Sequence, residues 1–186
     1  KVIAQPYYSS QNTYAPRYYQ RNAINRTVEA IAKGQARLLL VMATGTGKTI
    51  TSLNCLLEVY KKTGYYKAVI LVPTITLVNQ WENECKRFRF NNIIKVYSKR
   101  PKWKSDIESL HLQERIYGGE DKVSYVVIAT YASFAKDGAF DLLNSLSSRA
   151  MLIADEAHNM GSGGVRKMLP MIRYKRRIGL SATPDR

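Results

Sequence analysis

The residues best suited to chemistry lie in the segment MATGTGKTITSL, between an apolar run and an amphipathic run. Its Gly-x-Gly-Lys-Thr pattern is typical of a loop in which successive backbone N–H groups bind one phosphate. Lys48 would reach the β- and γ-phosphates of ATP, while the Thr49 hydroxyl would bind Mg²⁺. Met42 stands where the usual pattern has its first glycine. The predicted nucleotide-binding residues are Thr44, Gly45, Thr46, Gly47, Lys48 and Thr49.

A pair of acidic residues, Asp155 and Glu156, directly follows the apolar run MLIA. If that run is a strand of a parallel sheet, the pair lies at the carboxyl edge, where open α/β sheets bind ligands. Asp155 would then hold Mg²⁺ together with Thr49. Glu156 would act as a general base on the attacking water. Two acids after a strand are also common at helix starts, so the hydrolytic interpretation depends on the phosphate loop in the same chain.

Both motifs need a scaffold, and the rest of the sequence supplies one. Apolar runs of strand length recur as RLLLVMA, KAVILVP, IIKVY, SYVVIAT, RAMLIAD and RRIGLSA. Amphipathic stretches such as TITSLNCLLEVYKK and TLVNQWENECKRF lie between them, and a helix is expected over RYYQRNAINRTVEAIAKG, ending at Gly34. This alternation predicts an α/β fold: a parallel sheet with helices on both faces. The stretch 103–124 is expected to hold a helix and a loop around Gly118 and Gly119.

The charge of the chain favours a polyanionic partner. The 186 residues carry a formal net charge of +15, with a sequence pI near 9.9, and such an excess attracts phosphates. Basic residues are concentrated in 86–104, which has no acidic residue, and again in 166–177. No apolar run approaches the roughly 20 residues that span a bilayer. Cys55 and Cys85 lack a paired spacing, which predicts reduced thiols and a cytoplasmic protein.

Six short blocks occur in the order found in superfamily-two helicases, and the chain resembles the first motor domain of that family. The blocks ATGTGKT, ADEAH and LSAT resemble its motifs I, II and III. The block RYYQ resembles the adenine-recognition element, LVPTITLVNQW resembles motif Ia, and VIATY resembles the region of motif Ib. The resemblance implies a RecA-like P-loop fold and ATP-driven movement on nucleic acid. The resemblance implies that Lys48 and Glu156 are catalytic. It also implies that Gln20 reads the adenine edge, while Arg17 or a neighbouring tyrosine packs on the base.

The resemblance also implies roles in coupling and in nucleic-acid binding. His158 would connect the nucleotide site to Ser181 and Thr183, which link hydrolysis to movement along the strand. Thr74 and Thr130 would contact the nucleic-acid backbone.

Within the superfamily, the blocks RYYQ, MATGTGKT, DEAH and LSATPDR resemble most the motor subunits of type I and type III restriction enzymes and related DNA translocases. The expected partners are therefore duplex DNA, bound without regard to sequence, and restriction-modification subunits. The block VPTITLVNQW lacks the Asp-Arg pair common in type I motor subunits and is nearer to phage and repair helicases, which remain an alternative, as do RNA-directed motors. A non-hydrolysing nucleic-acid-binding module is a further alternative, although it would not need Glu156 beside Asp155. A small-metabolite kinase would need neither LSAT nor the basic stretch.

Residues 1–16, rich in Tyr, Ser, Gln and Pro, are expected to form a linker or arm, and residues 17–186 the first RecA-like domain. The resemblance implies a second RecA-like domain, which supplies arginine fingers to the γ-phosphate and has no counterpart in these residues. The start at Lys1 and the stop just after LSAT indicate a piece of a longer protein.

Overall fold

A computed structural model describes residues 16–99, 101–116, 123–136 and 138–182. These residues form one six-stranded sheet in the order β1-β6-β5-β2-β4-β3, in which every neighbouring pair is parallel. The strands are β1 Arg37–Val41, β2 Lys67–Val72, β3 Ile93–Val96, β4 Tyr125–Thr130, β5 Met151–Ala154 and β6 Arg176–Ser181. Each lies within one of the six apolar runs, so the predicted parallel α/β fold is confirmed.

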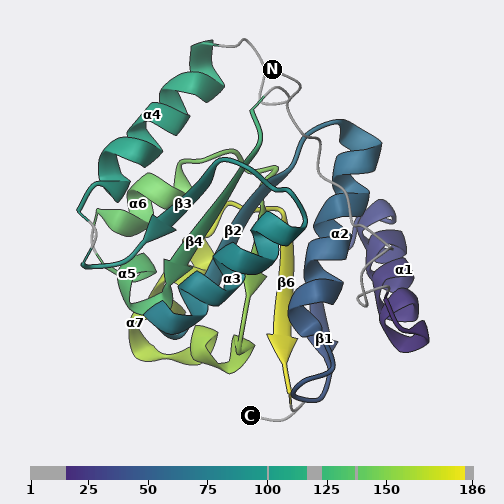
Figure 1. The fold of residues 1–186 in the computed structure, drawn as a ribbon. Coiled ribbons are helices and arrows are strands. Elements are labelled where there is room, and N and C mark those ends of the chain that lie inside the picture. The colour runs from purple at the N-terminus through teal and green to yellow at the C-terminus, as the bar shows by residue number, and fades with distance from the viewer. Residues whose placement is uncertain (1–15, 100, 117–122, 137, 183–186) are drawn as a thin grey trace.

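Helices cover both faces of the sheet, as Figure 1 shows. One face carries α1 Tyr18–Ala32, α2 Lys48–Thr63 and α3 Ile75–Arg87. The other face carries α4 Trp103–Ile116, α5 Tyr131–Phe134, α6 Ala139–Asn144, the short 3₁₀ helices η2 Ala157–Gly161 and η3 Leu169–Met171, and α7 Gly163–Met168. The helix expected within 103–124 is α4, whereas Gly118 and Gly119 lie outside the described residues. The arm expected over residues 1–16 falls almost wholly outside them as well.

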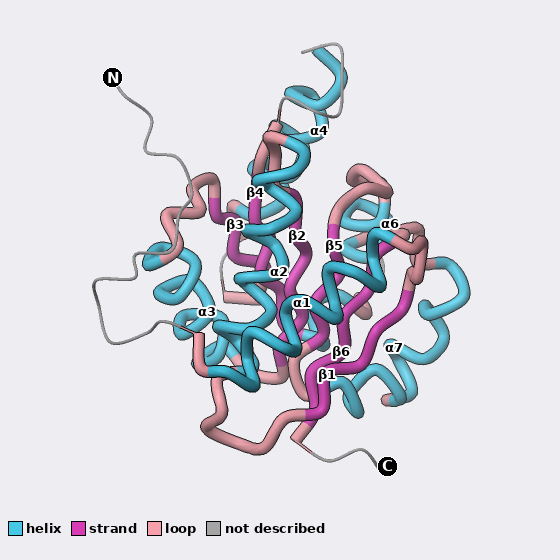
Figure 2. Tube along the Cα trace, turned by 90° about the vertical axis from the view of Figure 1, so that its right-hand side faces the viewer, coloured by secondary structure: helices cyan, strands magenta, loops and turns pink. Residues whose placement is uncertain are grey.

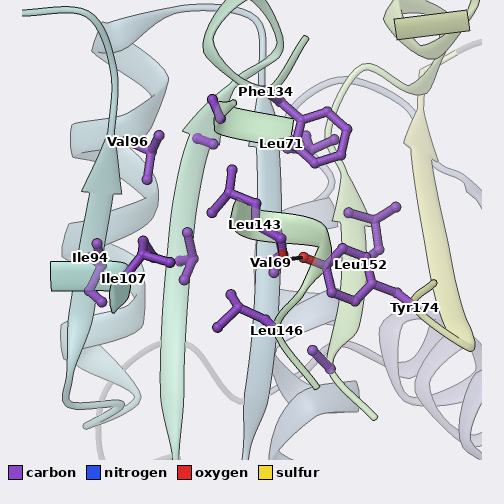
Figure 3. Packing of buried hydrophobic residues seen from close by; sticks show 14 of the residues in the cluster. Val69, Leu71, Ile94, Val96, Ile107, Phe134, Leu143, Leu146, Leu152 and Tyr174 are labelled. Carbon is purple, nitrogen blue, oxygen red and sulfur yellow. Dashed lines mark hydrogen bonds between the residues drawn. The ribbon is translucent and has the colours of Figure 1, made fainter. Parts of the chain in front are cut away.

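The two hydrophobic cores follow from the alternation of side chains along buried strands. Val69 and Leu71 of β2 face the core beneath α4 and α6, whereas Ile70 faces the core beneath α2 and α3. Figure 3 shows the first core, where Leu143 packs against the sheet and its carbonyl oxygen accepts a hydrogen bond from the Tyr174 hydroxyl. This double packing holds the central strands, and therefore their ends, in fixed positions.

A buried ion pair joins α4 to the amino end of β2. The Lys67 ammonium lies 2.7 Å from a carboxylate oxygen of Glu114, and both side chains are almost fully buried. The ammonium also lies 5.5 Å from the centre of the Tyr125 ring. Removing one partner of such a pair leaves a buried charge uncompensated, so the two residues depend on each other.

Because all six strands run in the same direction, the loops that follow them meet at one edge of the sheet. The register pairs Val41 with Ser181, and Ala154 with both Gly179 and Leu71. The phosphate loop, the acidic pair and LSAT therefore leave the sheet side by side, although they are far apart in the sequence. Figure 2, turned by 90° from Figure 1, shows β1, β6 and β5 as successive strands. No helix of the described residues is long and apolar enough to cross a membrane.

Candidate nucleotide site

The phosphate loop bends through two glycines with positive φ. Gly45 has φ +78° and Gly47 has φ +86°, a region that glycine enters without steric cost. Gly47 caps α2, so that the 16-residue helix begins at Lys48. The first turn of this helix therefore presents free N–H groups and the positive end of its dipole to the loop. The Lys48 ammonium folds back over the loop and donates to the Met42 carbonyl oxygen at 3.3 Å. Its contact with phosphate stays a prediction.

Gln20 joins the start of α1 to the phosphate loop. Its amide nitrogen donates to the Thr46 carbonyl oxygen at 2.6 Å, and its amide oxygen accepts from the Arg17 backbone N–H at 2.8 Å. A Cβ atom placed on Gly47 would lie 2.3 Å from the Gln20 amide nitrogen, so any larger residue at position 47 would displace this amide from the loop and would also be strained by the positive φ. The sequence placed Gln20 at the nucleotide, and the structure brings it against the phosphate loop. Its reading of an adenine edge, with Arg17 or a tyrosine packing on the base, stays a prediction.

Asp155 is held at the end of β5 by four hydrogen bonds. One carboxylate oxygen accepts from the Trp81 indole N–H at 3.0 Å, and the other accepts from the Glu156 backbone N–H at 3.0 Å. Its backbone N–H donates to the Leu71 carbonyl oxygen at 2.9 Å, and its carbonyl oxygen accepts from the Tyr131 hydroxyl at 2.7 Å. Asp155 is 8% exposed.

Opposing influences act on the Asp155 carboxyl. Burial raises its pKa above the ordinary value, because a low-dielectric site disfavours the charged form. The Trp81 hydrogen bond lowers the pKa, the Glu156 carboxylate raises it, and the Lys48 ammonium lowers it. The last effect arises because Lys48 lines the same cleft as Asp155.

Glu156 lies in the turn after β5, in a backbone conformation that residues other than glycine rarely adopt. Its φ is +49°, and the Asn159 side-chain amide donates to its carbonyl oxygen at 2.9 Å. A non-glycine residue in this region costs of the order of 1–3 kcal/mol and tends to occur at functional sites. The carboxylate is partly exposed and lies 3.6 Å from the His158 ring. Glu156 also lines the cleft that contains Lys48 and Thr49.

The two motifs face each other across one cleft of about 530 Å³. The lining residues come from the phosphate loop and the start of α2, from the acidic pair and from one side of α3: Thr44, Gly45, Gly47, Lys48, Thr49, Ile50, Leu77, Gln80, Trp81, Asn83, Glu84, Arg87, Asp155 and Glu156. Sequence reasoning missed the α3 wall. The amphipathic segment TLVNQWENECKRF covers nearly all of α3, whose buried residues are Val78, Trp81 and Cys85. That pattern does not indicate that Trp81 reaches Asp155.

The donor set suits Mg²⁺ with a nucleotide. Thr49 offers a hydroxyl and Asp155 a carboxylate, which are the hard oxygen ligands that Mg²⁺ prefers. The glycine-rich loop at the start of a long helix suits phosphates, and the cleft falls in the usual size range of ligand pockets, roughly 300–1,000 Å³.

Those residues predicted to act in coupling and in nucleic-acid binding that the structure describes do not line this cleft. His158 contacts Glu156 and Asn159, and Ser181 ends β6 as a buried residue, while Thr183 lies outside the described residues. The coupling role of these three residues is therefore still a prediction. Of the two residues expected at nucleic acid, Thr74 is exposed and caps α3 by accepting from the Leu77 N–H.

Thr130 is only 6% exposed, and its hydroxyl donates to the Ser133 hydroxyl at 2.9 Å. It also accepts from the Ser133 backbone N–H at 3.2 Å and so caps α5. The described contacts of this hydroxyl are thus internal ones.

Some of the basic residues in the stretch 86–104 form ion pairs with acidic residues of α3, and others do not in the described structure. Lys86 and Lys95 both pair with Glu82, at 2.9 and 2.7 Å, and Arg87 pairs with Glu84 at 2.8 Å. Lys99, Lys102 and Lys104 are exposed and follow the carboxyl end of β3. Within the part of the chain that the structure describes, these three lysines are in no ion pair, and they follow the outermost strand at the same carboxyl edge from which the phosphate loop and the acidic pair leave the sheet. Arg100 lies outside the described residues.

Known proteins resemble this chain over nearly its whole length. It is 34% identical to the type I restriction enzyme EcoAI endonuclease subunit of Escherichia coli, over 98% of this chain and 21% of that protein. It is 28% identical to the DNA 3'-5' translocase XPB2 of Sulfurisphaera tokodaii, over 91% of this chain and 31% of that protein. The chain thus spans about a fifth to a third of the length of these relatives.

Solved structures agree with the fold. A nuclease-deletion mutant of the type ISP restriction-modification enzyme LlaGI, in complex with a DNA substrate mimic, superposes with a TM-score of 0.69 at 27% identity, covering 91% of this chain and 18% of that one. The SWI2/SNF2 ATPase core of Sulfolobus solfataricus, in complex with double-stranded DNA, gives 0.72 at 19% identity, covering 98% and 34%. The family model described as type III restriction enzyme, res subunit (ResIII) matches residues 13–186, and the chain belongs to this family.

Proposed function

We propose that residues 17–186 form the first RecA-like domain of an ATP-driven DNA translocase or helicase. The observation that carries this proposal is the single cleft in which Lys48 and Thr49 face Asp155 and Glu156. Lys48 binds the β- and γ-phosphates, and Thr49 and Asp155 hold the magnesium ion. When bound, that ion neutralises charge on the phosphate oxygens. Glu156 orients and deprotonates the attacking water.

DNA is the proposed track, and a restriction enzyme is the proposed setting. The family match and the 34% identity to a type I endonuclease subunit support this choice, and restriction-modification subunits are the proposed partners. A repair-type motor is the second candidate, supported by the 28% identity to a DNA translocase. Both candidates move along a phosphate backbone, so they share the predictions below.

Replacing Lys48 by alanine should weaken binding of ATP with Mg²⁺ by about 10–100-fold, because a charged hydrogen bond to phosphate contributes roughly 1.5–3 kcal/mol. Titration of the chain with a fluorescent ATP analogue would measure the loss. Lys62→Ala is the matched control, since Lys62 is an exposed lysine at the other end of the same helix. Equal affinity in both variants would contradict the nucleotide site.

Binding to duplex DNA should be weak, indifferent to sequence and steeply dependent on salt, because counterion release drives contacts with phosphate. The exposed edge lysines should contribute to it. Each of Lys99→Ala and Lys102→Ala should lower the slope of log affinity against log salt by about 1. Lys86→Ala should change the slope less, because Lys86 is paired with Glu82. Fluorescence anisotropy between about 50 and 200 mM salt measures these slopes, and a flat salt response would rule out a phosphate track.

A further inference from the structure

Trp81 is the one side chain of α3 that donates a described hydrogen bond to the acidic pair. The indole N–H points at a carboxylate oxygen of Asp155 across 3.0 Å, and Trp81 is 1% exposed. The two residues are 74 positions apart in the sequence. The sheet brings them together, because α3 follows β2 and Asp155 follows the neighbouring strand β5.

The indole is fixed in place from two sides. Trp81 belongs to the buried stripe of α3 with Val78 and Cys85, and it packs into the core between that helix and the sheet. A tryptophan ring held by packing has little rotational freedom, so the direction of its N–H is set by the fold. The Asp155 carboxylate, held on its other oxygen by the Glu156 N–H, is therefore fixed in orientation as well.

The choice of acceptor separates a functional contact from a purely structural one. A buried indole N–H requires an acceptor in any core, and a backbone carbonyl oxygen would satisfy it. Here the Trp81 N–H donates instead to the Asp155 carboxylate, which binds magnesium under the proposed function. Partners in this position orient metal ligands, and replacing them typically costs about 10–100-fold in metal affinity.

We propose that Trp81 is a positioning residue that orients the Asp155 carboxylate for magnesium, so that α3 forms part of the nucleotide site. The inference rests on the proposed function, because it assumes that Asp155 binds the ion. Tyr131 has a complementary part: its hydroxyl holds the Asp155 carbonyl oxygen, and the side chain rises from the start of α5. Trp81 therefore fixes the side chain of Asp155, and Tyr131 fixes its backbone.

The test compares nucleotide affinity with and without the metal. Trp81→Phe keeps an aromatic ring in the core but removes the donor. It should weaken ADP binding in excess Mg²⁺ by about tenfold, at the lower end of the range for such partners, and leave ADP binding in EDTA unchanged. Trp103→Phe is the matched control, because Trp103 is also buried but packs in the core on the opposite face of the sheet. Isothermal titration calorimetry gives both affinities.

The outcomes separate this inference from the function on which it rests. If the unaltered chain binds ADP no better with Mg²⁺ than in EDTA, the proposed function fails. If it does respond to Mg²⁺ but Trp81→Phe responds equally, Trp81 does not position the ligand. An equal loss in Mg²⁺ and in EDTA would likewise overturn the inference, since it would show that the ring only shapes the cleft.

A second measurement covers the case in which Trp81→Phe does not fold. The chain has two tryptophans, so Trp103→Phe leaves Trp81 as the single reporter. Its fluorescence should shift when Mg²⁺ is added to the ADP-bound protein, because the indole donates directly to the ion's proposed ligand. An emission spectrum that ignores Mg²⁺ while calorimetry shows Mg²⁺-dependent binding would overturn the inference.

Discussion

The 186-residue chain is expected to bind ATP with Mg²⁺ yet to hydrolyse it about 10³–10⁵-fold more slowly than a polypeptide extended through a second RecA-like domain, the factor an arginine finger supplies in related systems. Under the proposed function the phosphate loop, Thr49 and Asp155, which all come from this chain, bind the nucleotide and its ion, so we expect binding without a second domain. Hydrolysis also requires cations aimed at the charge that develops on the γ-phosphate oxygens.

The size of the expected defect follows from the positive charge that a second domain would supply. By the transition-state relation, a factor of 10³–10⁵ corresponds to roughly 4–7 kcal/mol of barrier. Of the basic residues that line the cleft, Lys48 is committed to the phosphates, and Arg87 pairs with Glu84. We therefore propose that the finger comes from a second domain. Steady-state ATPase assays with and without DNA would compare the two polypeptides. DNA-stimulated turnover by the 186-residue chain at the rate of the longer one would refute the two-domain account.

Glu156→Gln should nearly abolish turnover in the extended polypeptide while leaving nucleotide affinity unchanged. The amide is close in shape to the carboxylate but cannot accept the proton of the attacking water. Loss of a general base costs about 10²–10⁴-fold in rate. Single-turnover hydrolysis would measure the rate, and equilibrium titration of ATP with Mg²⁺ would measure the affinity.

Asp155→Ala, unlike Glu156→Gln, should weaken binding of the magnesium–nucleotide complex itself. The substitution removes an oxygen ligand of the ion and leaves the Trp81 N–H without its buried acceptor. In EDTA the two variants should bind ADP alike. An equal loss of Mg²⁺-dependent binding in both would show that the division of roles between the two carboxylates is wrong.

Much of the fold was predictable because the signals are local. Each strand lies within an apolar run of its own, and α2 begins at Lys48, directly after the two glycines of the predicted phosphate loop. Even the position of Asp155 at a strand end follows from the sequence, because β5 ends one residue before it. Parallel pairing then brings both motifs to one edge without further information.

The contacts that complete the site were not predictable because they join residues far apart in the sequence. Nothing near Trp81 indicates that its indole meets Asp155, and nothing near Lys67 indicates that Glu114 neutralises it within the core. The ion pairs of the basic stretch are likewise not visible in the sequence. A single acidic residue just before the stretch, Glu82 of α3, pairs with both Lys86 and Lys95, and counting charges along the sequence does not reveal this.

The junction between the phosphate loop and the end of β6 has a mechanical consequence. The Met42 backbone N–H donates to the Ser181 carbonyl oxygen at 3.0 Å, one step beyond the paired residues Val41 and Ser181. Both partners of this bond are main-chain atoms, so it does not depend on the side chains at positions 42 and 181, as long as residue 42 is not proline. Strain applied to one segment therefore reaches the other through the peptide backbone itself, and the Ser181 hydroxyl can be deleted without cutting that connection.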